Sequence, residues 1–525
     1  MRRLFRTKPH SEIMGDVAIR GPQMHRALGA GHLTLLGIGG IIGAGIFVLT
    51  GTVAASNSGP AIVISFGLAG VACVLAGLCY AEFASMIPVA GSAYTYAYAT
   101  LGELVAWIIG WDLVLEYAMG AATVAVGWAG YMNSFLRGFN INLPPEWVAS
   151  PGIKMVNVPT ELVQSMHLAM PVGWQPYSDG VASYLVAHGV DPTTLATATG
   201  VFNLPAVLVT MAVTLLLIAG IRQSANFNAI IVAVKVAVVL TVIAVGFAFV
   251  DKANWHPFIP PNTTGKFGDF GWSGVFRGAG VIFFAYIGFD AVSTAAQESK
   301  RPQRDLPIGI LASLGICTVI YILMGLVLTG VVPYKTLQVP DPIAVAVEAM
   351  GIHWLAVAVK LGAIAGLTSV ILVLMLGQTR IFYSMSRDGL LPEVFSRLHK
   401  RFRTPWITTL VTGVVVSLVA ALVPMSVIGE LVSIGTLAAF VIVCASVIVL
   451  RRRHPELPRP FRTPWVPFTP ILGIITCLAL MIPLPVDTWL RLVIWMAIGF
   501  VIYFCYSRHN SKLHKKSTAN VNSEP

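Results

Sequence analysis

Apolar runs of about 20 residues follow one another along nearly the whole 525-residue chain, separated by shorter polar segments. A helix of this length crosses a hydrocarbon layer about 30 Å thick, because each residue adds about 1.5 Å. The runs lie at approximately 34–54, 61–87, 100–129, 200–220, 228–250, 274–297, 307–331, 353–383, 406–424, 428–450, 467–484 and 488–507. The pattern therefore predicts an all-α integral membrane protein with twelve transmembrane helices.

Composition supports this class and excludes others. Hydrophobic residues make up 56% of the chain and charged residues only 11%, against about 25% charged in soluble domains. The net charge of +11 does not indicate a nucleic-acid partner, because Lys and Arg lie in short connections and tails rather than on one basic face. The six cysteines lie in apolar runs without a CxxC pair, so no disulfide framework, metal site or cofactor is expected. Neither HExxH nor GxSxG occurs, so no enzyme is expected.

The basic residues predict the orientation of the chain. With the N-terminus inside, 25 of the 34 Lys and Arg residues fall in cytoplasmic segments and 6 in outer ones. The positive-inside rule then places both termini in the cytoplasm of a multi-pass protein of the cell (inner) membrane. Residues 1–33 and 508–525 are expected to be cytoplasmic tails, and the first span an uncleaved insertion signal. The proline-rich segment 130–199 is expected to be an outer loop with a short helix near its apolar patch, 181–188.

Glycines are concentrated at the centre of the first span, in GIGGIIGAGIF at 37–47. Glycine weakens a helix by about 1 kcal/mol relative to alanine and leaves the backbone accessible. One interpretation is a close helix-packing face, since Gly39 and Gly43 form a GxxxG pair. The glycines, which include Gly40 and Gly45, are distributed around the helix, and this favours a break in it.

The sixth span carries a second interruption, FFAYIGFDAVS at 283–293, which contains Gly288. Spans one and six correspond if the fold consists of two five-helix units of opposite orientation, and matching interruptions indicate a transporter's central site. The N-terminal ends of half-helices offer N–H donors to a carboxylate, and unwound carbonyls accept from an ammonium. An amino acid carries both groups.

Ionisable residues inside the spans need an explanation, because a Lys at a helix centre costs about 2.5–3.5 kcal/mol on insertion scales. Lys235 lies in the middle of the fifth span. It either forms a salt bridge with Asp290, Asp112 or Glu116 that orders the bundle, or gains and loses a proton during transport. Asp112 and Glu116 share one helix face, either as structural groups or, for the deeper Glu116, as a pocket or proton-linked carboxylate. Glu82, near the end of the second span, is either structural or part of an inner gate.

Several stretches together resemble a known family. They are LGIGGIIGAGIFVLTG in the first span, CYAEFASMIPVAGSAYTYAYATLGELVAWIIGWDLVLEY across the second and third, NFNAIIVAVKVAVV in the fifth, FFAYIGFDAVSTAAQESKRPQRDLPIGI in the sixth and GQTRIFYSMSRDGLLP after the eighth. Over roughly residues 25–508, in colinear order, the chain resembles the amino acid–polyamine–organocation transporters, and among them the bacterial relatives of the cationic amino acid transporters.

The resemblance implies a LeuT-like core at 34–450, with inverted repeats at about 34–250 and 274–450, discontinuous helices one and six, and peripheral helices eleven and twelve at 451–507. It implies a secondary active amino acid permease that works by alternating access, with proton-coupled uptake of neutral or cationic amino acids. Leu374 is apolar and favours neutral substrates. The alternatives are an amino acid or polyamine exchanger without proton coupling and, less favoured, a nutrient sensor. The expected partners are the amino acid, protons and the lipid bilayer; a small membrane protein partner is left open.

The resemblance also implies roles for individual residues. The residues expected to bind substrate are Ile41, Ala44, Gly45, Glu116, Phe284, Ile287 and Leu374. The substrate carboxylate would meet backbone amides near Ala44 and Gly45. Its ammonium would meet carbonyls around Ile41, Phe284 and Ile287.

Further roles follow from the same resemblance. Phe284 would cover the ligand, while Glu116 and Leu374 would shape the side-chain end of the pocket. Lys235 would take the place that a sodium ion has in sodium-coupled relatives, near Thr368 and Ser369, and would couple transport to protons. Ala44 stands where some members have Thr or Ser, so a hydroxyl contact to the substrate is absent.

Overall fold

The structure of the chain is a computed structural model. It describes Thr7, Leu168, Met170 and residues 28–86, 92–166, 172–220, 225–294, 299–402 and 404–513. Most of the predicted tail 1–33, and the predicted tail 508–525 from residue 514 onward, lie outside the described residues.

Helices form most of the described chain, as the apolar pattern predicts. They are α2 (Ala30–Ile41), α3 (Thr50–Val53), α4 (Ile62–Met86), α5 (Ser92–Thr100), α6 (Glu103–Arg137), α7 (Thr160–Ser165), α8 (Asp179–Ala187), α9 (Leu204–Ala219), α10 (Ala225–Gly246), α11 (Gly271–Ile282), α12 (Ala291–Thr294), α13 (Pro302–Val331), α14 (Pro342–Ala349), α15 (His353–Arg387), α16 (Trp406–Leu422), α17 (Met425–Arg453), α18 (Phe468–Met481), α19 (Val486–Ile502) and α20 (Arg508–Asn510). Each predicted apolar range coincides with one of these helices or with a helix that is interrupted.

Seven helical segments of the described chain are long and apolar enough to cross a membrane. They are Gly45–Met86, Glu103–Arg137, Ala229–Phe249, Pro302–Val331, His353–Arg387, Met425–Arg453 and Val486–Asn510. The apolar helices α2, α9, α16 and α18 are shorter. The predicted membrane-embedded, helical class is therefore confirmed in its coarse form.

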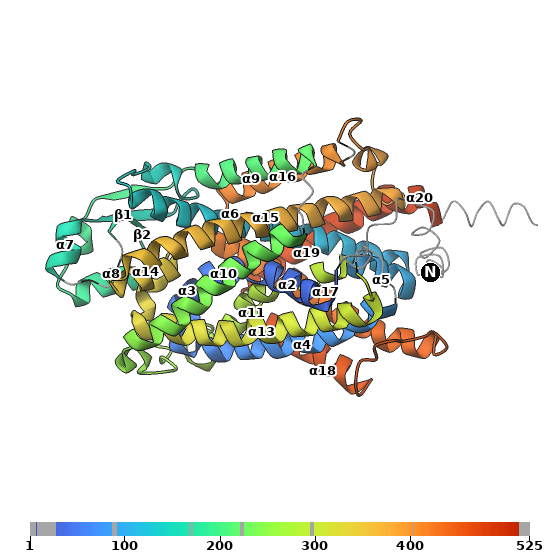
Figure 1. Ribbon diagram of the computed structural model, residues 1–525, viewed down its shortest axis with the longest axis horizontal. Coiled ribbons are helices and arrows are strands. Elements are labelled where there is room, and N and C mark those ends of the chain that lie inside the picture. Colours follow the sequence, from blue (N-terminus) through green and yellow to red (C-terminus); the bar gives the residue numbers. More distant parts are fainter. Residues whose placement is uncertain are drawn as a thin grey trace, which may run out of the picture.

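The long helices run side by side along the longest axis of the molecule (Figure 1). α15 packs on α6, α13 packs on α4 and α2, and α17 packs on α6 and α18. Their buried side chains form one continuous apolar core. Figure 1 shows α5 and α20 at one end of this bundle and β1, β2, α7 and α8 at the opposite end.

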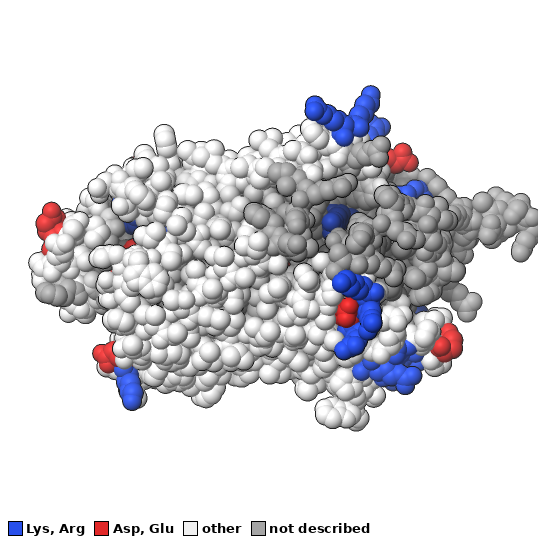
Figure 2. Space-filling view, viewed as in Figure 1, with Lys and Arg blue, Asp and Glu red and all other residues white. Residues whose placement is uncertain are grey.

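The sides of the bundle are apolar. On the face shown in Figure 2, charged side chains gather at the two ends, with a wide uncharged band between them. Leu215, Ile230, Val319 and Leu418 are large hydrophobic side chains exposed on these helices. Exposed apolar surface of this extent belongs against lipid rather than water.

The segment between α6 and α9 is a small folded unit, so the all-α prediction is wrong there. Strand β1 (Lys154–Val158) pairs antiparallel with β2 (Gly173–Pro176) and β3 (Thr197–Thr199), in the order β2-β1-β3. Val156 and Val158 of β1 pack with Leu185 of α8 in a separate buried cluster. The predicted short helix is present as α8. The strands were missed because each has five residues or fewer, too short for a clear alternating pattern.

Candidate functional site

The first predicted span is broken at its centre. Helix α2 ends at Ile41, and Ile42 adopts an extended conformation with φ −72° and ψ 90°. A π-helical segment, Gly45–Leu49, begins after Ala44. Of the predicted break glycines, Gly39 and Gly40 therefore lie in the last turn of α2, Gly43 lies in the break, and Gly45 opens the following segment.

The sixth predicted span is also broken. A 3₁₀ turn, Phe283–Tyr286, follows α11, and Ile287 is extended with φ −62° and ψ 137°. Gly288 has φ +116°, a backbone conformation that residues other than glycine rarely adopt. Helix α12 begins at Ala291. The chain thus leaves the helical conformation over Ile287 to Asp290, the part of the span that the sequence singles out.

The two breaks lie against each other, with their backbones in contact. A Cβ atom on Gly288 would lie 2.7 Å from the carbonyl carbon and oxygen of Gly40. A Cβ atom on Gly45 would lie 2.3 Å from Cα of Ala285. Real Cβ atoms essentially never approach other atoms closer than 3.0 Å. Gly45 and Gly288 are therefore required by the close approach of two segments that are far apart in the sequence.

Lys235 of α10 reaches the first break. Its Nζ donates hydrogen bonds to the carbonyl oxygens of Gly39, at 2.6 Å, and Ile42, at 2.8 Å, and the residue is 1% exposed. A Cβ on Gly366 of α15 would lie 3.2 Å from Cδ of Lys235, so this glycine leaves room for the lysine side chain. No carboxylate lies within ion-pair distance of Lys235 in the described chain. The salt bridge considered from the sequence is therefore wrong.

Tyr321 of α13 joins the two breaks, and no sequence pattern singled it out. Its hydroxyl oxygen lies 2.7 Å from the carbonyl oxygen of Ile41 and 2.8 Å from that of Ala285. Both carbonyls belong to the segments where the helices are interrupted. A single tyrosine in an apolar span gives no periodic signal, so only the folded chain shows this role.

Carboxylates of α6 lie beside the second break. The hydroxyl of Tyr117 donates to Oδ2 of Asp290 at 2.6 Å. Glu116 is buried, with Thr436 of α17 at hydrogen-bonding distance, and it interacts electrostatically with Asp290 and Asp112. Both oxygens of Asp112 are buried without a hydrogen-bond partner in the described chain. The structure thus brings together the acidic residues of the third and sixth predicted spans.

The other residues expected to bind substrate are buried at or near the breaks. Ala44 lies in the first, and Phe284 and Ile287 lie in the second. Leu374 of α15 packs on α6, where its Cδ1 is 3.3 Å from the position that a Cβ on Gly120 would take. Gly120 is one turn from Glu116.

Thr368 and Ser369 lie on α15, but the described chain has no hydrogen bond from Lys235 to either hydroxyl. The hydroxyl of Thr368 accepts from Nε1 of Trp128 at 2.9 Å and donates to the carbonyl of Ile364 at 2.7 Å. The bond from Trp128 ties α15 to α6. Lys235 therefore contacts carbonyls of the first span, and its place near the two hydroxyls stays a prediction.

The arrangement provides both kinds of backbone group to a small zwitterion. The segment that begins at Ala44 presents the first amides of a helical turn, which have no acceptor within the helix. Carbonyls at the breaks already accept hydrogen bonds, that of Ile41 from Tyr321 and that of Phe284 from the backbone N–H of Ile287, but each has a second lone pair.

Several known proteins are similar to this chain over most of its length. The sequence model of a family described as "Amino acid permease" matches residues 28–504. A methylthioribose transporter of Bacillus subtilis is 43% identical over 98% of this chain and its own full length. The branched-chain amino acid permease BcaP of the same organism is 45% identical over 94% of this chain and 95% of its own. Cationic amino acid transporter 4 of Arabidopsis thaliana, a vacuolar protein, is 39% identical over 83% of this chain and 65% of its own.

Proposed function

The chain belongs to the amino acid permease family, and we propose that it takes up neutral amino acids by proton symport through alternating access. The family match and the permease relatives support amino acid transport across a membrane. The observation that supports the substrate class is the contact between the two broken helices, because it places backbone donors and acceptors around one point. No other part of the described chain combines interrupted helices with buried ionisable groups in this way.

The substrate's carboxylate is assigned to the amides near Ala44 and Gly45, and its ammonium to carbonyls of Ile41, Phe284 and Ile287. A helix N-terminus favours an anion, because the unpaired N–H groups and the helix dipole both point toward it. Phe284 covers the ligand from the second break. These assignments use one backbone surface from each half of the chain, so binding links the two halves.

The side-chain end of the pocket favours apolar substrates. Leu374 and Gly120 present no charge at this end of the pocket. A guanidinium or ammonium side chain beside these two residues would lose its hydration and gain no partner from them. The branched-chain permease at 45% identity agrees with a preference for neutral side chains.

Proton coupling is assigned to Lys235. When charged, its amine forms strong hydrogen bonds to the carbonyls of Gly39 and Ile42 and fixes α10 to the first break. When the proton leaves, the neutral amine holds these carbonyls less tightly, and the break is free to move. Uptake of a proton with the substrate on one side and its release on the other would then drive the cycle.

The proposal extends to the whole chain. Residues 34–450 form a ten-helix core of two inverted repeats, at about 34–250 and 274–450, and residues 451–507 form two peripheral helices. Twelve spans place both termini on the same side of a bacterial inner membrane. That side is the cytoplasm, because most Lys and Arg residues lie in the tails and connections on the side of the termini.

The test is uptake by the purified protein in liposomes, with and without an inward proton gradient. Radiolabelled leucine, alanine and arginine are supplied together with methylthioribose, the substrate named for one relative. We expect gradient-stimulated uptake of leucine and alanine in the wild type and loss of the stimulation in Lys235→Ala. Lys360→Ala is the matched control, because this second buried lysine, near the N-terminal end of α15, contacts Ser134 and Glu348 and not the first break.

The outcomes separate the candidate mechanisms. Uptake that ignores the gradient but requires amino acid preloaded inside would establish exchange instead of symport. Uptake of methylthioribose alone would remove the assignment of carboxylate and ammonium to the two breaks. Equal loss of gradient stimulation in both lysine variants would show that Lys235 has no specific role in coupling.

A further inference from the structure

A groove of about 560 Å³ lies away from the two breaks, between the first turns of α13 and the segment that joins α17 to α18. Its walls include Arg304, Pro307, Ile308, Leu311, Ala312 and Phe461. Arg304 and the neighbouring Gln303 are its polar lining residues, and the others are apolar. Such a surface matches an elongated ligand with an anionic end and a hydrocarbon body.

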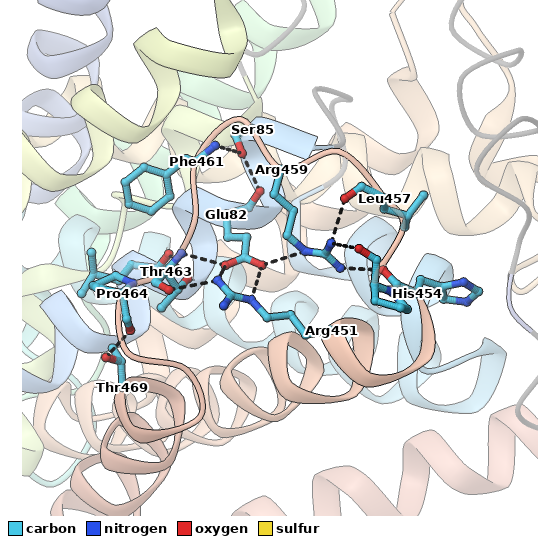
Figure 3. A network of polar contacts seen from close by, with 12 residues as sticks. Glu82, Ser85, Arg451, His454, Leu457, Arg459, Phe461, Thr463, Pro464 and Thr469 are labelled. Carbon is cyan, nitrogen blue, oxygen red and sulfur yellow. Dashed lines mark hydrogen bonds and ion pairs between the residues drawn. The ribbon is translucent and has the colours of Figure 1, made fainter.

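The second wall of the groove is fixed to the transport core by Glu82 (Figure 3). The Glu82 carboxylate of α4 accepts from Nε and Nη2 of Arg451, at 3.0 and 2.7 Å, and lies 3.4 Å from Nε of Arg459. It also accepts from the backbone N–H of Thr463 at 2.8 Å. The connecting segment is thus held by several bonds to one buried carboxylate.

A further bond fixes the groove residue itself. The backbone N–H of Phe461 donates to Oγ of Ser85 at 3.3 Å, one turn from Glu82 on α4. The aromatic wall is therefore a built part of the fold rather than a loosely placed loop. Opposite it, α13 is packed along α4 for much of its length, so both walls are anchored to the same helix.

Positive charge surrounds the polar end. Arg304 is exposed, and its guanidinium has no hydrogen bond or ion pair within the described chain. Lys300 and Arg301, close to Arg304 in sequence, are exposed, and so is Arg462, the neighbour of Phe461 in the chain. Glu82 faces two arginines, so that network also retains a positive charge. An anion at Arg304 would find no competing carboxylate in the groove wall.

The exposed neighbours place the groove at the edge of the hydrocarbon layer. Ile308 is exposed on α13, Trp465 is 83% exposed just before α18, and Phe468, the first residue of α18, is 76% exposed. Tryptophan is enriched where a membrane meets water, and basic pockets between helices at this depth suit lipid head groups. Apolar residues of this size would not be left open to water.

We propose that this groove is a binding site for an anionic phospholipid of the leaflet that it faces. The phosphate lies at Arg304, and one acyl chain follows Leu311, Ala312 and Phe461. The bound lipid bridges α13 and the segment held by Glu82. A zwitterionic phospholipid binds less well, because its ammonium opposes the surplus positive charge.

The test measures lipid adducts on the purified chain by native mass spectrometry. Phosphatidylglycerol and phosphatidylcholine with identical acyl chains are titrated separately into the detergent-solubilised protein. We expect preferential binding of phosphatidylglycerol and an about fivefold weaker first adduct in Arg304→Gln, from the free energy of about 1 kcal/mol per basic residue at a membrane surface. Arg453→Gln is the control, since it removes an exposed arginine of α17 outside the groove.

A second variant tests the hydrocarbon part of the site. Ala312→Trp fills the groove while leaving Arg304 in place, and we expect the phosphatidylglycerol preference to disappear at an unchanged melting temperature. Equal binding of the two lipids, or equal effects of Arg304→Gln and Arg453→Gln, would overturn the proposal. Competition by the free head group glycerophosphoglycerol as strong as by the intact lipid would point to a soluble phosphate ester instead. The readout does not involve transport, so it stands apart from the test of the proposed function.

Discussion

Glycine occupies positions at which the two broken helices touch. The cluster of glycines in the first span indicated a break, yet the sequence did not show that Gly40 and Gly45 contact the other break. Gly288 gave a weak signal, because one glycine in an apolar run is common. Its positive φ and its contact with Gly40 explain why no side chain fits there.

Replacing Gly288 by alanine should destabilise the protein and abolish uptake. The strained φ alone costs about 1–3 kcal/mol, and the added Cβ would also push the two breaks apart. Thermal unfolding in detergent, followed by uptake in liposomes, measures both effects. Gly315→Ala is the matched control, since nothing lies within 4 Å of its added Cβ.

Gly315→Ala should be neutral, or more stable by up to about 1 kcal/mol, because alanine is the better helix former. If the two variants melt at the same temperature and transport equally well, the close contact between the breaks is not a feature of the native protein.

The segment that links α17 to α18 is an element held by a single buried carboxylate. The sequence placed Glu82 near a helix end and left open whether it is structural or part of a gate. In the structure it is 1% exposed and contacts Arg451 and Arg459, which lie more than 350 residues further along the chain. Hydropathy carries no information about such pairing, because most of the sequence separates the two partners.

Glu82→Gln should lower the melting temperature by several degrees and make the linking segment sensitive to trypsin. The neutral amide leaves the guanidinium of Arg459, which is largely buried, without a countercharge, and the loss of one partner of a buried pair costs about 3–5 kcal/mol. Limited proteolysis and thermal unfolding give independent readouts.

Glu456→Gln provides the comparison within the same segment. Its carboxylate is exposed and pairs with His454, an arrangement that contributes at most about 1 kcal/mol. Equal sensitivity of the two variants to trypsin would argue against Glu82 as the anchor.

At the scale of the whole molecule, the charged ends and apolar sides are those of a membrane protein, and the two ends differ from each other. The folded unit of β1, β2, β3 and α8 lies at one end, and α20 lies at the other. The proposed orientation puts the sheet outside the cell, because the segments at the α20 end hold most of the basic residues.

Cysteine labelling in intact cells tests this orientation. In a Cys505→Ser background the remaining cysteines are buried. A membrane-impermeant maleimide should label Glu161→Cys in α7, but label Glu393→Cys only after the cells are permeabilised; both positions are exposed in the structure. Labelling of Glu393→Cys alone in intact cells would reverse the proposed topology.

The sequence by itself determined the class of the protein, the approximate ranges of its helices and the two places where helices are interrupted. These properties follow from local patterns, since hydropathy over about 20 residues and the conformational freedom of glycine act within one segment. The family resemblance, confirmed by the comparisons, added amino acid transport.

Only the tertiary structure decided which groups meet. It gave Lys235 two carbonyl contacts and, within the described chain, no salt bridge, which was one of the two alternatives considered from the sequence. It also introduced Tyr321 between the breaks and built a small sheet where a loop was expected. It also joined Glu82 to the far end of the chain. Such contacts depend on how helices that are distant in sequence pack against each other. The fit of their surfaces decides which residues meet, and no local sequence pattern contains this information.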